Sequence, residues 1–223
     1  MNTTTTAWLW SVGLILVAYL FGSIPTGYWA GKLLKGIDIR QEGSGSTGAT
    51  NVLRTLGKVP GIAVLSIDIL KGMGAVGLVS VWYQWGLPDS IPEAWQAALI
   101  TLTAIAAIVG HSKSIWLNFT GGKSVATSLG VLFVMNPWVA LGTLGSFLVT
   151  IALTRIVSIS SIIGAIAVSV LMIIFQQPLP YLLFGIVGGI YVIVRHKTNI
   201  ARLLAGTEPK LGQKLENAGA STD

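Results

Sequence analysis

Seven apolar runs, separated by short polar connections, constrain this chain more than any other feature of its sequence. A helix needs about 20 residues to cross the hydrocarbon of a bilayer, and about 17 at the short end. The third, fourth and seventh runs are short by this measure. Charged residues make up only 10% of the chain, whereas a soluble domain carries about 25%. We therefore expect an all-α integral membrane protein with seven transmembrane helices, in the runs Ala7–Ala30, Val59–Trp82, Trp95–Gly110, Lys123–Met135, Pro137–Thr154, Val157–Phe175 and Leu179–Val194.

The basic residues predict the orientation of these helices. Apart from Lys71, every lysine and arginine lies at or beyond the end of the first, third, fifth or seventh run. The connection between the second and third runs carries only the acidic residues Asp89 and Glu93. Because cytoplasmic connections are enriched in lysine and arginine, we expect the N-terminus outside and the C-terminus in the cytoplasm. Leaving out the short fourth run would place Arg155 on the opposite side from the basic residues that precede it.

Local signals predict where helices end and how the chain is divided. Pro25 is expected to kink or end the first helix, because proline lacks a backbone N–H. Gly206 and Pro209 are expected to stop any helix near the C-terminus. We expect a single membrane domain over residues 1–210 and a disordered cytoplasmic tail over residues 211–223.

The first of three polar stretches on the predicted cytoplasmic side runs from Gly43 to Arg54. Its glycine and hydroxyl residues allow backbone N–H groups to point toward one centre, and Arg54 adds a planar cation, which suits phosphate. The stretch nearly matches a dinucleotide fingerprint, but no βαβ pattern surrounds it. It also nearly matches a P-loop, but Ala49 stands where the essential lysine belongs. A flexible Gly/Ser linker is the alternative interpretation.

The second stretch places a lysine beside the start of the fourth run. Gly121 and Gly122 immediately precede Lys123, so a helix N-terminus and an ammonium group can bind an anion together. Lys123 could instead extend to lipid headgroups. His111 lies in the same stretch, and a simple anchor at the end of the third run is its alternative role.

The third stretch contains His196, Asn199 and Arg202, which recur every three residues and would share one face of a helix. A basic segment that holds anionic lipid is the alternative interpretation. The connection after the fifth run adds the hydroxyl groups of Ser158 and Ser161 on the same side. The predicted cytoplasmic face is therefore rich in anion-binding groups and poor in general bases.

The absence or scarcity of some residue types limits the reactions that this chain can catalyse. The chain has no cysteine and two histidines, so thiolate chemistry and a histidine metal cage are excluded. Neither histidine has an aspartate five positions later, so the H-x4-D pair of many glycerolipid acyltransferases is absent. No metal site or cofactor site is expected. Asp68 and Lys71 lie inside the second run, where charges are costly and tend to pair, and a structural and a functional role for them both remain open.

In their order and context, these motifs resemble the bacterial acyl-phosphate:glycerol-3-phosphate acyltransferases, the PlsY family. One position departs from the family pattern, because Ser46 stands where asparagine is usual. The resemblance covers nearly the whole chain and rests on the segments Gly22–Pro25, Asp38–Arg40, Gly43–Arg54, Asp68–Gly72, Gly110–His111, Gly121–Thr127, Arg195–Asn199 and Gly206–Glu208.

The resemblance implies that an acyl group moves from acyl phosphate to the sn-1 hydroxyl of glycerol 3-phosphate, which yields lysophosphatidic acid and inorganic phosphate. It implies no cofactor and no metal. The partners are the two substrates and membrane lipids, with no nucleic acid and no obligate protein partner. The implied location is the bacterial inner membrane, with the active site on the cytoplasmic face.

The same resemblance assigns candidate residues. The implied catalytic residues are Ser44, Arg54, Lys123, His196 and Asn199. The implied substrate-binding residues are Gly43, Gly45, Ser46, Gly48, Thr50, Asn51, His111, Gly122, Ser158 and Ser161.

Two other classes of protein remain as alternatives. A membrane transporter of a phosphorylated or other organic anion suits seven spans, but it needs a site near the bilayer midplane. Only Asp68 and Lys71 approach that depth. A non-catalytic scaffold for anionic lipids needs the basic residues but not the glycine, hydroxyl and asparagine residues beside them.

Overall fold

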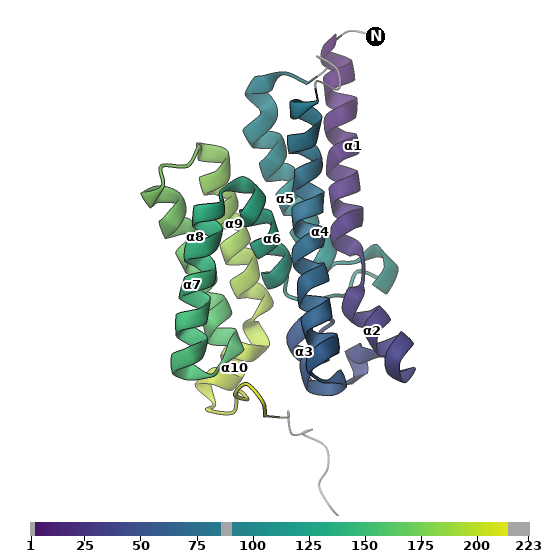
Figure 1. Cartoon of the computed structure of the whole chain (residues 1–223), viewed down its shortest axis with the longest axis vertical. Helices are drawn as coiled ribbons and strands as arrows, with labels where there is room; N and C mark the ends of the chain where they lie inside the picture. Colours follow the sequence, from purple (N-terminus) through teal and green to yellow (C-terminus); the bar gives the residue numbers. More distant parts are fainter. Residues whose placement is uncertain (1–2, 86–90, 214–223) are drawn as a thin grey trace, which may run out of the picture.

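The computed structural model describes residues 3–85 and 91–213, and these residues form an all-helical bundle (Figure 1). The predicted all-α class is confirmed. Short 3-10 turns lie at Ile39–Gln41, Glu93–Trp95 and Ile115–Leu117. The α-helices are α1 (Thr3–Ser23), α2 (Thr26–Lys35), α3 (Ala49–Leu56), α4 (Lys58–Gln84), α5 (Gln96–Ser112), α6 (Val125–Met135), α7 (Pro137–Thr154), α8 (Val157–Ile174), α9 (Leu179–Arg195) and α10 (Lys197–Leu204).

The long helices form two groups that α6 connects (Figure 1). Helices α1, α4 and α5 pack together, as do α7, α8 and α9, while α6 packs on α4 and α7. The apolar core runs through both groups and includes the fully buried residues Val76, Leu132, Met172 and Phe184. The short helices α2, α3 and α10 gather at the end of the bundle opposite the start of α1 (Figure 1).

Two glycines bring α4 and α6 into close contact. A Cβ atom on Gly72 would lie 2.2 Å from the carbonyl oxygen of Thr127, and a Cβ atom on Gly130 would lie 2.0 Å from the carbonyl oxygen of Ile69. Small residues allow helix backbones to approach closely inside membranes. The start of α6, which follows Lys123, is therefore held against the middle of α4.

The two predicted helix stops, at Pro25 and near Gly206, agree with the structure. α1 ends at Ser23 and α2 begins at Thr26, so the chain breaks at Pro25. α10 ends at Leu204, before Gly206 adopts a φ of 68°. Most of the predicted C-terminal tail, residues 214–223, lies outside the described residues.

The predicted number of seven membrane-crossing helices is not confirmed by helix length and composition. Within residues 3–85 and 91–213, five helical segments are long and apolar enough to cross a membrane, or six if α9 and α10, bent by 59°, form one broken span. The remaining apolar helix, α6, has 11 residues and a length of about 16 Å, against a hydrocarbon thickness of about 30 Å. It begins at Val125 instead of Lys123 because Ser124 adopts a left-handed backbone conformation.

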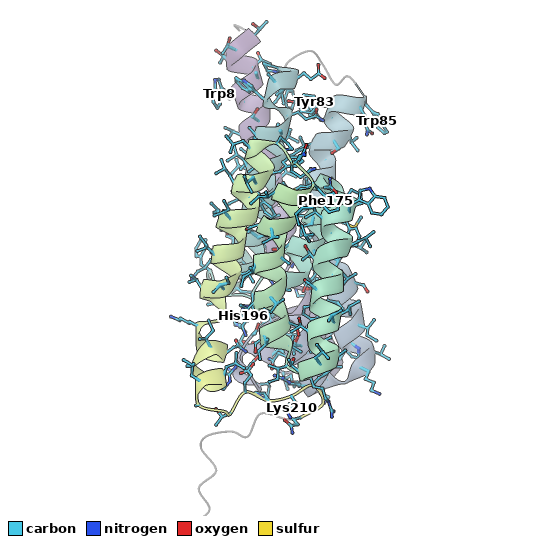
Figure 2. All side chains as sticks on the ribbon, turned by 90° about the vertical axis from the view of Figure 1, so that its left-hand side faces the viewer. Trp8, Tyr83, Trp85, Phe175, His196 and Lys210 are labelled. Carbon is cyan, nitrogen blue, oxygen red and sulfur yellow. The ribbon has the colours of Figure 1, made fainter. Side chains whose placement is uncertain are left out.

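The outer surface of the bundle has the character of a lipid-facing surface. Large apolar side chains project from the long helices, including Leu153 at 81% exposure and Ile173 at 63%. Trp8 and Trp85 lie near one end of the bundle, whereas Lys210 lies at the other (Figure 2). Aromatic residues of this kind are enriched where a membrane protein meets the headgroup region.

Candidate active site

The polar centre of the molecule forms around the carboxylate of Glu208, which follows α10. Glu208 Oε1 accepts hydrogen bonds from Ser158 Oγ at 2.8 Å and from Asn199 Nδ2 at 2.6 Å. Its Oε2 accepts one from Arg202 Nε at 2.7 Å. Lys123 Nζ donates to Asn199 Oδ1 at 2.5 Å. These five residues, the Glu208 cluster, bring together α8, α10 and the turn before α6.

Positive charge exceeds negative charge at the Glu208 cluster. Lys123 interacts electrostatically with Glu208 and also with Arg54, Arg195 and Arg202. When Arg54 and Arg195 are counted with the Glu208 cluster, four cations and one carboxylate give a net charge of +3. Such an excess inside a partly buried site favours binding of a multiply charged anion.

Burial shifts the pKa values of these groups. It lowers the pKa of Lys123 from 10.5 to about 8, although the carboxylate of Glu208 opposes the change. It also lowers the pKa of Arg54. Burial alone would raise the pKa of Glu208, but hydrogen bonds from Asn199, Ser158 and the Arg202 guanidinium bring it below its ordinary value. Glu208 is therefore ionised at neutral pH, and Lys123 is mostly protonated.

Asn51 orders the loop that precedes α3. Its Oδ1 accepts the N–H of Ser44 at 2.9 Å, and Gly43 and Gly45 adopt positive φ values of 54° and 68°. Its amide nitrogen lies within hydrogen-bond distance of three backbone carbonyl oxygens, those of Ile39 at 3.1 Å, Glu42 at 3.0 Å and Ser46 at 2.9 Å. The loop thus has a defined conformation, unlike a Gly/Ser linker, and the amide of Asn51 is used within it.

The rest of this stretch connects the loop to the Glu208 cluster. Ser46 Oγ accepts the N–H of Gly48 at 3.2 Å, so the serine in place of the usual asparagine serves as an acceptor within the loop. Thr50 is half-buried in the first turn of α3. At the end of the same helix, Arg54 Nη2 donates to the carbonyl oxygen of Pro209 at 3.4 Å, next to Glu208.

The turn Gly121–Lys123 is fixed on two sides. Arg195 Nη2 donates to the carbonyl oxygens of both glycines, at 3.4 Å and 3.1 Å. On the other side, the Gly122 N–H donates to the carbonyl oxygen of His111 at 3.2 Å. Ser124 follows with a φ of 64°, and its Oγ donates to the Ile108 carbonyl oxygen at 2.6 Å. The turn is thereby anchored to α5 and α9.

Three other predicted residues take separate positions. His196, at the junction of α9 and α10 (Figure 2), has Nδ1 2.8 Å from the Val192 carbonyl oxygen. Because a carbonyl oxygen only accepts, Nδ1 carries the proton and Nε2 is the acceptor of the neutral ring. Ser161 Oγ donates to the carbonyl oxygen of Val157 in its own helix, at 2.9 Å. His111 is buried, and its Nδ1 lies 3.6 Å from Asp68 Oδ1.

A cavity of about 450 Å³ joins two of the predicted stretches. Gly45 from the loop before α3 and Gly121 from the turn before α6 both line it. Arg40, Lys113 and Arg195 bring positive charge to its wall. Both glycine-containing segments therefore border one polar space at the same end of the bundle.

Sequence reasoning missed Glu208 as a member of the site. Between Arg195 and Lys210 it is the only carboxylate in a basic stretch, and that isolation is a signal that could have identified it. The described residues contain no group of three or more His, Cys, Asp or Glu side chains placed to hold a metal ion.

The fold and the site together define a class of protein: a polytopic membrane protein with a positively charged polar site at one end of its helical bundle. The chain belongs to the glycerol-3-phosphate acyltransferase family, whose profile matches residues 12–206. The resemblance to the PlsY family seen in the sequence is confirmed.

Curated relatives extend over almost the whole chain. The glycerol-3-phosphate acyltransferase of Crocosphaera subtropica is 63% identical over 214 residues, which cover 96% of this chain and 100% of the relative. The enzyme of the same name from Rippkaea orientalis is 65% identical over 210 residues, with 94% and 96% covered.

Solved structures share the fold. The glycerol 3-phosphate form of PlsY, an integral membrane glycerol 3-phosphate acyltransferase, matches with a TM-score of 0.80 and 38% identity, and the match covers 91% of this chain and 96% of that one. The lysophosphatidic acid form of PlsY matches with a TM-score of 0.77 and 37% identity, and covers 90% and 94%. The protein is therefore an integral membrane acyltransferase of this family.

Proposed function

We propose that the protein transfers an acyl group from acyl phosphate to the sn-1 hydroxyl of glycerol 3-phosphate. The observation that carries this proposal is the excess of positive charge at the Glu208 cluster, where Lys123 and Arg202 accompany one carboxylate and where Arg54 and Arg195 also act on Lys123. Both proposed substrates carry a phosphate, and arginine and lysine are the side chains that bind phosphate most strongly. The solved structure with a TM-score of 0.80 is a glycerol 3-phosphate form, which supports this choice of acceptor.

The phosphate of one substrate binds at the Glu208 cluster. It accepts hydrogen bonds from side chains that donate to Glu208 in the structure. Arg54 and Lys123 supply charge, while Asn199 and Ser158 supply neutral donors. Ser158 suits this role better than Ser161, whose hydroxyl is bonded within its own helix.

The loop before α3 receives the headgroup of the acyl phosphate. Its glycines, Gly43, Gly45 and Gly48, leave room for a ligand to approach the backbone, and Ser44 and Thr50 add hydroxyl groups. Asn51 keeps the loop in shape through its own hydrogen bonds. Gly45 of this loop lines the same cavity as Gly121, which lies two residues before Lys123.

In the chemical step, the sn-1 hydroxyl oxygen of glycerol 3-phosphate bonds to the acyl carbon, and the bond from that carbon to the phosphate oxygen breaks. The leaving phosphate carries away the electron pair, and a substrate phosphate oxygen takes the proton of the sn-1 hydroxyl. Neutral His196 accepts a hydrogen bond at Nε2 from the other hydroxyl group of glycerol 3-phosphate and so orients the substrate. Acyl phosphate is an activated donor, so positioning and charge stabilisation provide most of the rate.

The proposal includes a location for the site. The start of α1 and the short helix α10 lie at opposite ends of the bundle (Figure 1). The basic residues gather at the α10 end, which we assign to the cytoplasm by the positive-inside rule. Seven crossings, with the short α6 as the fourth, then place the N-terminus outside. The membrane is the bacterial inner membrane, and its lipids surround the apolar outer surface.

Product analysis in proteoliposomes tests this function against the transporter alternative. The protein is reconstituted with palmitoyl phosphate and radiolabelled glycerol 3-phosphate, and the labelled products are separated by chromatography. We expect labelled 1-palmitoyl lysophosphatidic acid. Label that enters the vesicle lumen as unchanged glycerol 3-phosphate, without any lipid product, would favour transport instead.

A further inference from the structure

We propose that His111, Asp68 and Thr26 form a positioning network that sets the turn Gly121–Lys123, and with it the ammonium group of Lys123. The proposal rests on the proposed function, because its expected effect is on the turnover of that same site. None of the three residues belongs to the Glu208 cluster. Their influence passes through the backbone of the turn.

Asp68 connects three segments of the chain in the interior of the bundle. Its Oδ1 accepts a hydrogen bond from Thr26 Oγ1 at 2.6 Å and lies 2.8 Å from Lys71 Nζ. The same oxygen lies 3.6 Å from His111 Nδ1. Lys71 Nζ also donates to the carbonyl oxygen of Ile24 at 2.9 Å, in the break between α1 and α2. The start of α2, the middle of α4 and the end of α5 therefore meet at one carboxylate.

Burial argues against a direct role of these charges in substrate binding. The side chains of Asp68, Lys71 and His111 are 1%, 3% and 5% exposed. A charge inside a membrane protein is costly unless it is paired, and a substrate that took one partner would leave the other unpaired. A positional role accounts for both the pairing and the burial.

The imidazole of His111 packs against the turn at Gly122. A Cβ atom added to Gly122 would lie 2.1 Å from His111 Nε2, and the Gly122 N–H donates to the carbonyl oxygen of His111 at 3.2 Å. The ring therefore contacts the backbone of the residue that immediately precedes Lys123. The Nδ1 edge of the ring lies 3.6 Å from Asp68 Oδ1, and the Nε2 edge lies against Gly122 in the turn.

The turn needs support from other elements because it leads directly into a strained residue, Ser124. Ser124 has a φ of 64°, a left-handed conformation that costs a non-glycine residue about 1–2 kcal/mol. Its side chain forms no capping hydrogen bond to α6 and instead binds the carbonyl oxygen of Ile108. The direction in which Lys123 projects is thus set by contacts from α5 together with Arg195 of α9, and His111 provides the α5 contact at Gly122.

A double-mutant cycle of Gly122→Ala and His111→Ala tests the contact. Each protein is measured for kcat and KM for glycerol 3-phosphate and for its melting temperature in detergent. We expect Gly122→Ala to lower kcat by about 100-fold, because a shift of about 1 Å at a catalytic group has an effect of that size. Removing the ring makes room for the new methyl group, so the double variant should be about 10-fold more active than Gly122→Ala alone.

Matched threonine variants provide a second test that does not depend on the glycine. Thr26→Val removes the hydrogen bond to Asp68, and Thr103→Val removes a hydroxyl group that binds only within α5. Both side chains are buried. We expect a roughly 10-fold lower kcat for Thr26→Val and an unchanged kcat for Thr103→Val, with similar melting temperatures.

The outcomes separate this proposal from the proposed function. An inactive wild-type protein would contradict the function, but the melting temperatures would still report the His111–Gly122 contact through the same cycle. An active wild type whose two single effects simply multiply in the double variant would overturn the positioning network. Equal kcat values for the two threonine variants would overturn it as well.

Discussion

Lys123 and Asn199 are 76 positions apart in the chain, yet Lys123 Nζ donates a hydrogen bond to Asn199 Oδ1 at 2.5 Å. The amide nitrogen of Asn199 then donates to Glu208 Oε1 at 2.6 Å. One asparagine thus connects the lysine before α6 with the carboxylate after α10. It accepts on one side and donates on the other, a combination that neither aspartate nor alanine can provide.

Replacing Asn199 by aspartate should therefore inactivate the enzyme. A carboxylate cannot donate to Glu208, and it adds a second negative charge where we place a substrate phosphate. Losing one such contact costs about 2–4 kcal/mol of transition-state stabilisation, roughly 30- to 1000-fold in kcat/KM. Asn136→Asp is the matched control, because Asn136 caps α7 through its side-chain oxygen and aspartate caps equally well. Comparable kinetics for both variants would argue against the role of Asn199.

Arg54→Lys should remain badly impaired although it keeps the positive charge. Lysine lacks the planar fork that binds phosphate through two hydrogen bonds, and the guanidinium of Arg54 also reaches the backbone of Pro209. We expect a loss of about 30- to 1000-fold in kcat/KM for glycerol 3-phosphate. Arg155→Lys, an exposed arginine after α7, should behave as the wild type. If both variants are fully active, Arg54 does not bind a substrate phosphate.

Activity should fall as pH rises through about 8. Burial lowers the pKa of Lys123 to about 8, so the free enzyme loses this cation above that pH, and kcat/KM decreases accordingly. Unfolding does not explain the loss. The folded pKa lies below the ordinary 10.5, so the unfolded chain binds more protons between these values, and this group makes the fold more stable as pH rises.

A Lys123→Arg variant controls for this assignment, because arginine stays charged throughout the range. Whatever activity it retains should show no decrease near pH 8 in a kcat/KM profile measured from pH 6 to 10. An alkaline decrease that persists unchanged in the variant would assign the titration to another group.

Glu208→Gln should lower the melting temperature of the protein and increase the rise in melting temperature that added phosphate produces. The substitution raises the net charge of Lys123, Arg54, Arg195, Arg202 and residue 208 from +3 to +4 and removes the ion pair with Arg202. We expect a lower melting temperature, and a larger increase on adding inorganic phosphate than the wild type shows, because a ligand that binds the folded state stabilises it. Glu93→Gln, at the other end of the bundle, should respond as the wild type. Equal phosphate responses in Glu208→Gln and wild type would mean that the carboxylate and phosphate do not share a site.

Local sequence patterns predict much of this fold. The apolar runs correspond to helices, and Pro25 marks the break between α1 and α2. Length is a weak signal at α6, which has only 11 residues and is shorter than a typical transmembrane helix. Its start was misplaced because the left-handed Ser124 depends on a contact with Ile108, sixteen positions earlier.

The sequence predicts the three stretches that form the site, but it does not predict how they are arranged in space. Ser158 and Glu208 are 50 positions apart, and no periodicity brings them together. Residues such as Asn51 and Ser161 have side chains that could bind a ligand, but in the structure these side chains form hydrogen bonds within the loop or the helix. Only the packing of the helices decides which hydroxyl or amide groups face the charged centre.

The most direct test of the proposed reaction compares acyl donors. Purified protein in detergent is given glycerol 3-phosphate with either palmitoyl phosphate or palmitoyl-CoA, and lysophosphatidic acid is quantified together with released phosphate or CoA. We predict equimolar lysophosphatidic acid and phosphate from palmitoyl phosphate, at an unchanged rate with EDTA, and no product from palmitoyl-CoA. Comparable turnover with palmitoyl-CoA, or none with palmitoyl phosphate, would contradict the proposal that the site binds the phosphate groups of both substrates.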